Sequence, residues 1–201
     1  MRKMIGAVLC IAILFCVCTA SVSAYGEHWL DTVEAPSDYA YSFAVVGDTQ
    51  VVCERSPEGF TAIYDWLLQN HKQKKMQMVI GMGDITENKT DMKEWNLAYE
   101  QIMRLHGKVP LSLIRGNHDD TAMFNNTFYE LYEDTDGSYE AATLNNSYQL
   151  LKAGDQHYLI LALDYGPSDA VLRWAGDVCK QHPGYNVIVT THGYLDRGGK
   201  L

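Results

Sequence analysis

The chain has 201 residues, of which 47% are hydrophobic and 20% are charged, a composition typical of a globular protein with enough length for one sizeable core. Its 25 Asp and Glu outnumber its 16 Lys and Arg, which gives a formal net charge of -9. This charge argues against a general nucleic-acid binder, whose affinity comes from basic patches, but it does not exclude a small anionic substrate held by a metal.

Residues 1–24 have the pattern of a secretory signal peptide. Arg2 and Lys3 give a short basic start, Met4 to Cys18 is an apolar run, and Val22-Ser23-Ala24 has the small residues of a cleavage site. A membrane anchor is the alternative, but the apolar run is shorter than the roughly 20 residues that a spanning helix needs. We therefore predict a secreted protein, extracellular or periplasmic, with no stable membrane span once the signal is cleaved.

Removal of residues 1–24 would leave two of the five cysteines, Cys53 and Cys179. In an oxidising compartment they could form one disulfide bond. Two buried thiols are the more common outcome, and we expect that arrangement while leaving the bridge open.

The mature chain begins with an N-terminal lead-in segment, residues 25–40, in which Gly, Pro and acidic residues follow no period. From there the pattern predicts one domain, residues 41–201. Its first half alternates apolar runs, typical of buried strands, with amphipathic helical stretches. The expected strands are 41–46, 76–80 and 111–114, and the expected helices are 56–68 and 92–103. A helix in each gap makes two βαβ units, so the three strands should pair in parallel.

The second half adds a helix at 121–132, a hairpin of 147–152 and 157–164, a helix that begins at Ser168-Asp169, and a strand at 186–191. The hairpin implies antiparallel pairing, so the sheet should be mixed and the fold class α/β. Residues 133–140 are acidic and contain Gly, but they lack the ligand spacing of an EF-hand. We expect a solvated loop there rather than a calcium site.

Four of the expected strands end in residues that can bind a metal or move a proton. Open α/β folds keep their sites at this carboxyl edge of the sheet. The residues delivered there are Asp48, Gln50, Asp84, Glu87, Asn88, Asn117, His118, Asp119 and His192. Oxygen and imidazole donors without a thiolate suit Mn, Fe or Zn better than a structural zinc site. If two cations share the site, a carboxylate must bridge them, and Asp84 on the central strand is the natural bridge.

Each piece alone is weak, because Gly-Asp and Gly-Asn pairs are ordinary turn sequences. Their combination and order carry more weight: Gly47-Asp48-x-Gln50, Gly83-Asp84-x-x-Glu87-Asn88, Gly116-Asn117-His118-Asp119 and Thr191-His192. This series resembles the calcineurin-like metallophosphoesterase superfamily, and most of all its secreted bacterial members with a Gly-Asp-Thr-Gln first motif. The resemblance covers roughly residues 41 to 196.

The resemblance implies a four-layer αββα sandwich with mixed sheets and a centre of two divalent metal ions: Mn, Fe or Zn, or alternatively Mg. The implied reaction is hydrolysis of a phosphate monoester or diester by a metal-bound hydroxide. The implied metal ligands are Asp48, Gln50, Asp84, Asn117 and His192, with Asp84 bridging both ions. The implied catalytic residues are His118, which would stabilise or protonate the leaving oxygen, and Asp119, which would orient His118.

Three features depart from the family pattern. Gln50 stands where the family usually has His, so its neutral amide oxygen would either shift the metal preference toward Mn or Mg or make a contact outside the ligand set. Glu87 stands where Asp is frequent. No Gly-His-x-His sequence follows His192. We therefore expect a chain truncated at its C-terminus, with the last strands and one imidazole ligand for each metal missing.

Two alternative functions are compatible with parts of the pattern. A catalytically degenerate protein of this fold would bind a metal or ligand without turnover; the retained motifs argue against it, whereas Gln50 and the missing last motif favour it. A nucleotide-binding domain is suggested by Gly81-Met82-Gly83, but Thr86 occupies the third glycine position and a loop with acids follows. The expected partner is a small phosphoester, and the sequence leaves both its identity and the oligomeric state open.

Overall fold

The computed structural model describes residues 38–193, which lie almost entirely in one compact unit that begins at Ala40. The predicted signal peptide, most of the lead-in segment and residues 194–201 lie outside the described residues. Among residues 38–193, every helix is too short or too polar to cross a membrane.

The first half of the described chain forms a parallel sheet with strand order β1-β2-β3. Its strands are β1 (Ser42–Val46), β2 (Met76–Gly81) and β3 (Leu111–Leu113). The connections are helical: α2 (Gln50–Arg55) and α3 (Pro57–Asn70) join β1 to β2, and α4 (Met92–Ile102) joins β2 to β3. This confirms the two βαβ units and the central position of β2.

The second half forms a mixed sheet with strand order β4-β5-β6-β7. Its strands are β4 (Gly137–Ser138), β5 (Asn146–Ala153), β6 (Gln156–Leu163) and β7 (Asn186–Thr190). β5 is antiparallel to both β4 and β6, whereas β7 runs parallel to β6. The parallel pairing places the end of β7, with His192 just beyond it, on the same side as the end of β6.

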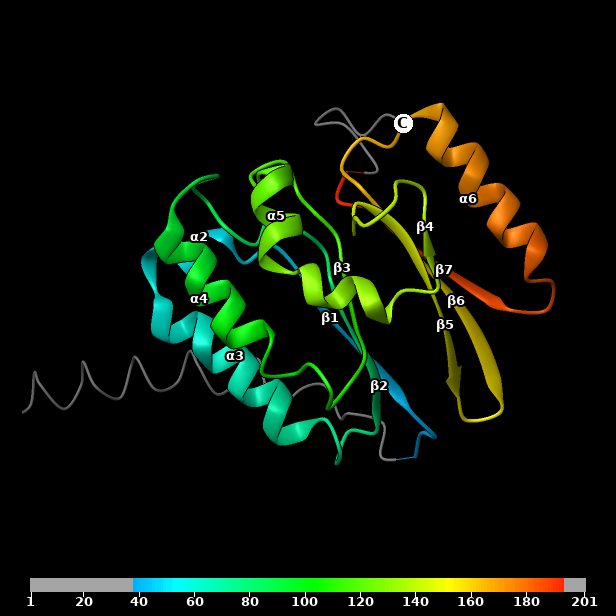
Figure 1. The fold of residues 1–201 in the computed structure, drawn as a ribbon. Coiled ribbons are helices and arrows are strands. Elements are labelled where there is room, and N and C mark those ends of the chain that lie inside the picture. Colours follow the sequence, from blue (N-terminus) through cyan, green and yellow to red (C-terminus); the bar gives the residue numbers. More distant parts are fainter. Residues whose placement is uncertain (1–37, 194–201) are drawn as a thin grey trace, which may run out of the picture. The chain divides into compact units, whose positions relative to one another are not determined.

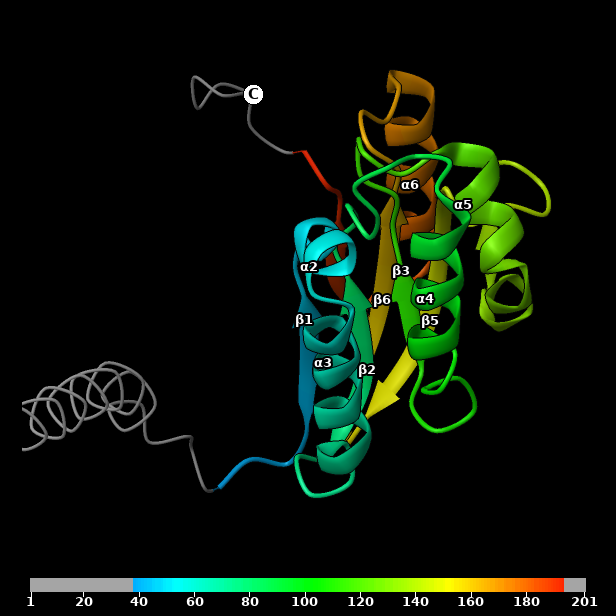
Figure 2. The same cartoon turned by 90° about the vertical axis from the view of Figure 1, so that its left-hand side faces the viewer.

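The two sheets face each other, and helices cover their outer faces (Figures 1 and 2). Helices α2 to α5 and the 3-10 helix η1 pack on the β1–β3 sheet, while α6 packs on β6. Helix α5 spans Thr121–Thr127, η1 spans Tyr129–Asp134 and α6 spans Asp169–Gln181. The described residues therefore form the four layers αββα that the resemblance implies.

Alternating side chains explain why the central strands are apolar throughout. On β2, Val79 faces the helices, while Met78 and Ile80 face the second sheet. On β6, Leu159 packs beneath α6, and Ile160 packs against the first sheet. Strands that are buried on both faces need continuous apolar runs rather than alternation, which is the pattern that the sequence showed.

Local structure differs from the sequence-based expectation at several points. A helix, α2, begins directly at Gln50, because the N–H groups of Thr49 and Gln50 both donate to the carbonyl oxygen of Asp84 and fix the turn after β1. The helix expected at 121–132 is divided between α5 and η1. The expected loop at 133–140 contains the short strand β4, whose pairing with β5 continues the second sheet.

Cys53 and Cys179 are both free thiols within the described part of the chain, but the expectation that both are buried is confirmed for Cys53 only. Cys53, on α2, is 2% exposed and packs in the core between the first sheet and its helices, whereas Cys179 lies partly buried on α6 beside the second sheet. Burial, with smaller effects from the carboxylates of Glu94, Asp119 and Asp91, raises the pKa of the Cys53 thiol to about 12. The reactive thiolate is therefore suppressed at Cys53.

We expect iodoacetamide at pH 8 to alkylate Cys179 in the folded protein and to leave Cys53 unmodified. Peptide mass spectrometry over a time course measures both positions separately. In guanidinium chloride the two cysteines should react at similar rates, which provides the control. Equal rates in the folded protein would contradict the burial of Cys53.

Candidate metal centre

The carboxylate of Asp84 is the central group of the candidate site. Asp84 is 3% exposed and has a φ of 48°, a left-handed conformation that is uncommon for a residue with a side chain. Its Oδ1 accepts a hydrogen bond from the backbone N–H of His118 at 2.9 Å. Its Oδ2 lies 3.1 Å from Nε2 of Gln50 and 3.2 Å from Nε2 of His192. Residues that follow four different strands thus meet at one side chain.

Two glycines allow this close approach. Gly83 has a φ of 83°, and a Cβ on it would lie 2.6 Å from the backbone nitrogen of Gly116. A Cβ on Gly116 would in turn collide with the carboxylate of Asp84. The loops after β2 and β3 therefore lie so close together that neither position 83 nor position 116 has room for a side chain.

The His192 ring presents Nε2 to Asp84, while a backbone carbonyl group holds its Nδ1. Its Nδ1 lies 2.8 Å from the carbonyl oxygen of Met82. Because a carbonyl can only accept, Nδ1 carries the hydrogen, and Nε2 is left as a donor atom for a metal, as in many metal sites. His192 is only 10% exposed, and its Nδ1 lies 3.9 Å from Oδ1 of the much more exposed Asp48.

Gln50 and Asn117 are the two amide residues among the predicted ligands. Oε1 of Gln50 is the one buried side-chain polar atom without a hydrogen-bond partner among residues 38–193. Such an unpaired buried oxygen is costly unless it has a further partner, for example a cation. Asn117 is exposed at the end of the loop after β3, and its position leaves the side chain open to solvent.

The donor set fits a divalent cation of oxygen and nitrogen preference. Within the described residues, no three His, Cys, Asp or Glu side chains converge tightly enough to hold a metal by themselves. The set brought together here instead combines carboxylate and imidazole groups with the Gln50 amide. Two observations favour a metal at this place: the unpaired Oε1 of Gln50, and the His192 ring, whose Nδ1 is held by the Met82 carbonyl oxygen while Nε2 faces Oδ2 of Asp84.

The contact expected between Asp119 and His118 is not the contact that the structure has. Nδ1 of His118 instead lies 3.2 Å from the carbonyl oxygen of Glu87 and 3.6 Å from its Oε2. Glu87, at the end of the loop that carries Asp84, is therefore the residue that orients the His118 ring. His118 stays partly exposed, with 36% of its side chain open to solvent.

Asp119 has a different position, fully buried between two loops. Its carboxylate accepts hydrogen bonds from the backbone N–H groups of Ile85, Thr86 and Gly116 at 2.9 to 3.2 Å. Burial raises the pKa of Asp119; the three N–H donors lower it in part, and the charge of Asp84 raises it further. Asp119 thus ties the loop after β2 to the loop after β3.

Glu94 is a supporting residue that the sequence did not reveal. It lies in the first turn of α4, is 6% exposed, and accepts hydrogen bonds from the backbone N–H groups of Glu87 and Asn88 at 2.7 and 3.1 Å. It also binds the side-chain amide of Asn88 at 2.6 Å. The Asp91-x-x-Glu94 spacing is typical of a helix start, but this spacing does not indicate that Glu94 reaches back to the loop.

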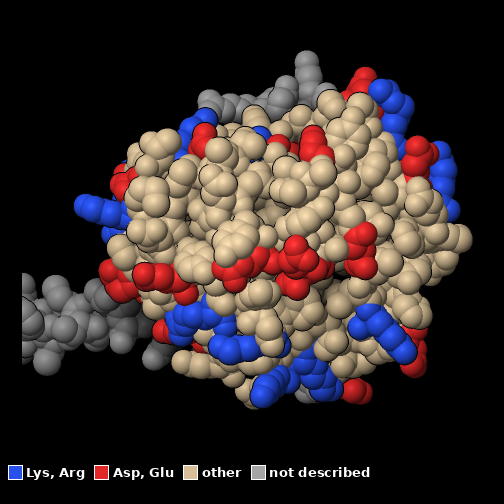
Figure 3. Space-filling view, in the orientation of Figure 1, with Lys and Arg blue, Asp and Glu red and all other residues tan. Residues whose placement is uncertain are grey.

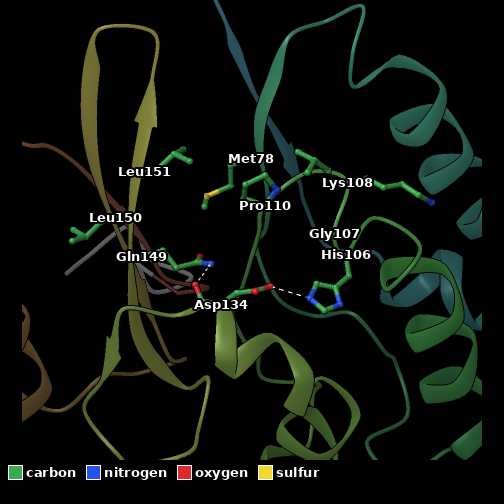
Figure 4. A pocket seen from close by; sticks show the side chains of 10 residues that line it. Met78, His106, Gly107, Lys108, Pro110, Asp134, Gln149, Leu150 and Leu151 are labelled. Carbon is green, nitrogen blue, oxygen red and sulfur yellow. Dashed lines mark hydrogen bonds and ion pairs between the residues drawn. The ribbon is translucent and has the colours of Figure 1, made fainter.

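A separate cavity of about 400 Å³ lies between the sheets beside Pro110, at the amino end of β3 (Figure 4). Met78, Pro110 and Leu151 give it apolar walls, and an ion pair of 3.1 Å between His106 and Asp134 closes one side. The residues predicted for the metal centre all follow strand carboxyl ends and do not line this cavity. The candidate site and the cavity are therefore distinct.

Comparison with known proteins agrees with this geometry. Residues 41–201 match the calcineurin-like phosphoesterase family. The chain is also 28% identical over 169 residues to the uncharacterized protein YvnB of Bacillus subtilis (strain 168). That match covers 80% of this chain, whereas the chain spans 13% of the length of YvnB. Since the family match extends over most of the chain, this protein belongs to the calcineurin-like phosphoesterase family.

Proposed function

We propose that this chain is a metal-dependent phosphoester hydrolase whose centre holds two divalent cations. Family membership suggests metal-dependent phosphoester hydrolysis. One observation in particular supports the two-cation centre: the buried, left-handed Asp84 places Oδ2 within 3.2 Å of both His192 Nε2 and Gln50 Nε2. A carboxylate between donor groups from different strands is suited to bridging two ions.

The proposed ligands are Asp48, Gln50, Asp84, Asn117 and His192. Their oxygen and imidazole atoms suit Mn, Fe or Zn, and the harder amide oxygen of Gln50 favours Mn or Mg. The chemistry that a bound pair of such ions supplies is a lowered pKa of water and neutralisation of charge on the phosphoryl oxygens. The protein would contribute by holding the carboxylate, amide and imidazole ligand groups together at the carboxyl ends of the strands.

His118 is proposed to serve the leaving oxygen. Because its Nδ1 is held by the carbonyl oxygen of Glu87, Nδ1 carries a hydrogen and Nε2 remains for the substrate. A protonated imidazole in this position can give the Nε2 proton to the departing oxygen. In this proposal Glu87 orients the His118 ring. Asp119 acts indirectly, by holding together the loops after β2 and β3.

The proposed substrate is a small phosphoester, either a monoester or a diester, rather than a nucleic acid bound by its backbone. The formal charge of -9 supports this proposal. Figure 3 shows a band of Asp and Glu side chains across one face of the molecule. Lys and Arg side chains lie below this band and at the outer edges of the same face. Mixed charge of this kind differs from the continuous basic surface that backbone recognition uses.

We also propose that the protein is exported, on the basis of residues 1–24. If so, expression in a secreting bacterial host should yield extracellular or periplasmic protein that begins at Tyr25. N-terminal sequencing of the exported protein measures this directly. Recovery of the intact N-terminus in the membrane fraction would support the anchor instead.

Asp84→Asn should lower Mn-dependent hydrolysis of a chromogenic phosphomonoester and a phosphodiester by at least about 100-fold, because the shared carboxylate is lost while its volume is kept. Asp177→Asn is the matched control, since Asp177 is exposed on α6 and pairs with Lys180; its rate should equal that of the wild type. Equal rates in wild type and Asp84→Asn would rule out the two-cation centre. Mn binding without turnover in the wild type would favour the ligand-binding alternative.

His118→Gln should lower kcat by about 10²- to 10⁴-fold for an alkyl phosphate, whose leaving oxygen needs a proton. The loss should be much smaller for a nitrophenyl phosphate, whose leaving group departs without one. The measurement is kcat for a series of esters plotted against the leaving-group pKa. A loss of the same size across the series would contradict the assigned part of His118.

A further inference from the structure

An ion pair links the two sheets directly beside the candidate metal centre. Arg115, just after β3, donates from Nε and Nη2 to the two carboxylate oxygens of Asp164, just after β6, at 2.9 and 3.1 Å. Only 15% of the Arg115 side chain and 16% of the Asp164 side chain are exposed. Bidentate pairs of this kind fix orientation as well as charge. Two elements that belong to different sheets are thus held in one relative position.

The remaining contacts of Arg115 are with the loop that carries Asn117 and His118. Its Nη1 donates to the carbonyl oxygens of Gly116 at 3.2 Å and Asp119 at 3.1 Å. The guanidinium therefore spans the whole Gly116–Asp119 turn from end to end. Four hydrogen bonds use most of its five N–H donors, so the group is occupied in holding this turn rather than open for a substrate phosphate.

Asp164 connects the same pair to the other side of the centre. Its carbonyl oxygen accepts a hydrogen bond from Oγ1 of Thr191 at 3.2 Å, and Thr191 directly precedes His192. Its backbone N–H donates to Oδ1 of Asn146 at 3.1 Å, which anchors this residue to β5. Through Asp164, the turn that carries His118 and the segment that carries His192 share one support.

We propose that Arg115 and Asp164 form a positioning pair that sets the loop after β3 against His192, so that the centre can assemble across the two sheets. The proposal rests on the proposed function, because the groups positioned are the proposed ligands and the proposed proton donor. A lysine at position 115 would keep the charge but lose the planar fork, and asparagine at position 164 would lose the charge and one acceptor. Either change leaves the remaining partner of a largely buried ion pair without the bidentate contact that it has in the wild type.

The test compares Asp164→Asn and Arg115→Lys with the wild type in the full chain. Asp164→Asn should weaken Mn²⁺ binding, measured by calorimetry, by about 10- to 100-fold, as expected for a supporting residue of a metal site. The variant's kcat for the phosphoester should fall by a similar factor, while KM stays close to the wild-type value, because the substrate contacts remain. Arg115→Lys should give the same split in smaller degree.

A second readout does not depend on metal or turnover. In metal-free protein, hydrogen–deuterium exchange at the amides of Gly116 and His118 should be faster in Asp164→Asn than in wild type. The amide of Gly116 donates to Asp119 and that of His118 to Asp84, so their exchange reports the order of this turn. Unchanged exchange would overturn the proposal even if the wild type showed no hydrolysis.

The matched control is Asp65→Asn, which removes the same group from an ion pair with Arg104 of 2.6 Å that joins α3 to the segment after α4. Asp65→Asn should leave Mn²⁺ affinity, kcat and the exchange of Gly116 unchanged. Losses of equal size in both variants would mean general destabilisation and would overturn the positioning role. A wild type that binds Mn²⁺ without turnover would contradict the proposed hydrolysis alone, since the affinity and exchange ratios would still decide the role of the pair.

Discussion

The buried carboxylate of Asp84 is the interaction on which the candidate centre depends. The backbone carbonyl oxygen of Asp84 accepts hydrogen bonds from the N–H groups of Thr49 and Gln50 at the start of α2. In its carboxylate, Oδ1 accepts from the backbone N–H of His118, and Oδ2 faces His192 and Gln50. The left-handed conformation that permits all of this costs of order 1–3 kcal/mol. The hydrogen bonds from the surrounding loops offset this cost, so none of these loops can be rearranged without disturbing the others.

Two further buried carboxylates make the irregular loop after β2 possible. Residues 85–88 follow no regular structure, so their backbone N–H groups need partners other than a strand or helix. Asp119 binds the first two and Glu94 binds the last two. Three carboxylates within one small region concentrate negative charge, and the raised pKa of Asp119 reflects both its burial and its neighbour Asp84. A cation bound nearby would relieve this repulsion.

The centre also depends on how the two sheets are held against each other. Met78 and Ile80 of β2 meet Ile160 of β6 in the middle of the sandwich. At the edge where the metal centre is proposed, the sheets are joined by polar contacts instead: Arg115 with Asp164, and the His192 ring with β2's following loop. A bidentate arginine–carboxylate pair fixes orientation as well as distance, which suits a site that draws its proposed ligands from both sheets.

The sequence by itself determined most of the elements, because apolar runs and helical periodicity depend on residues close together in the chain. It also placed Asp84 and His192 at strand ends, and these two side chains do lie 3.2 Å apart. The sequence did not predict which residue orients His118. The neighbouring Asp119 was expected to do so, but Glu87 makes the contact. A carboxylate can accept hydrogen bonds from the backbone N–H groups of whichever loop lies beside it. Only the tertiary structure, which brings particular loops side by side, decided which carboxylate binds which loop.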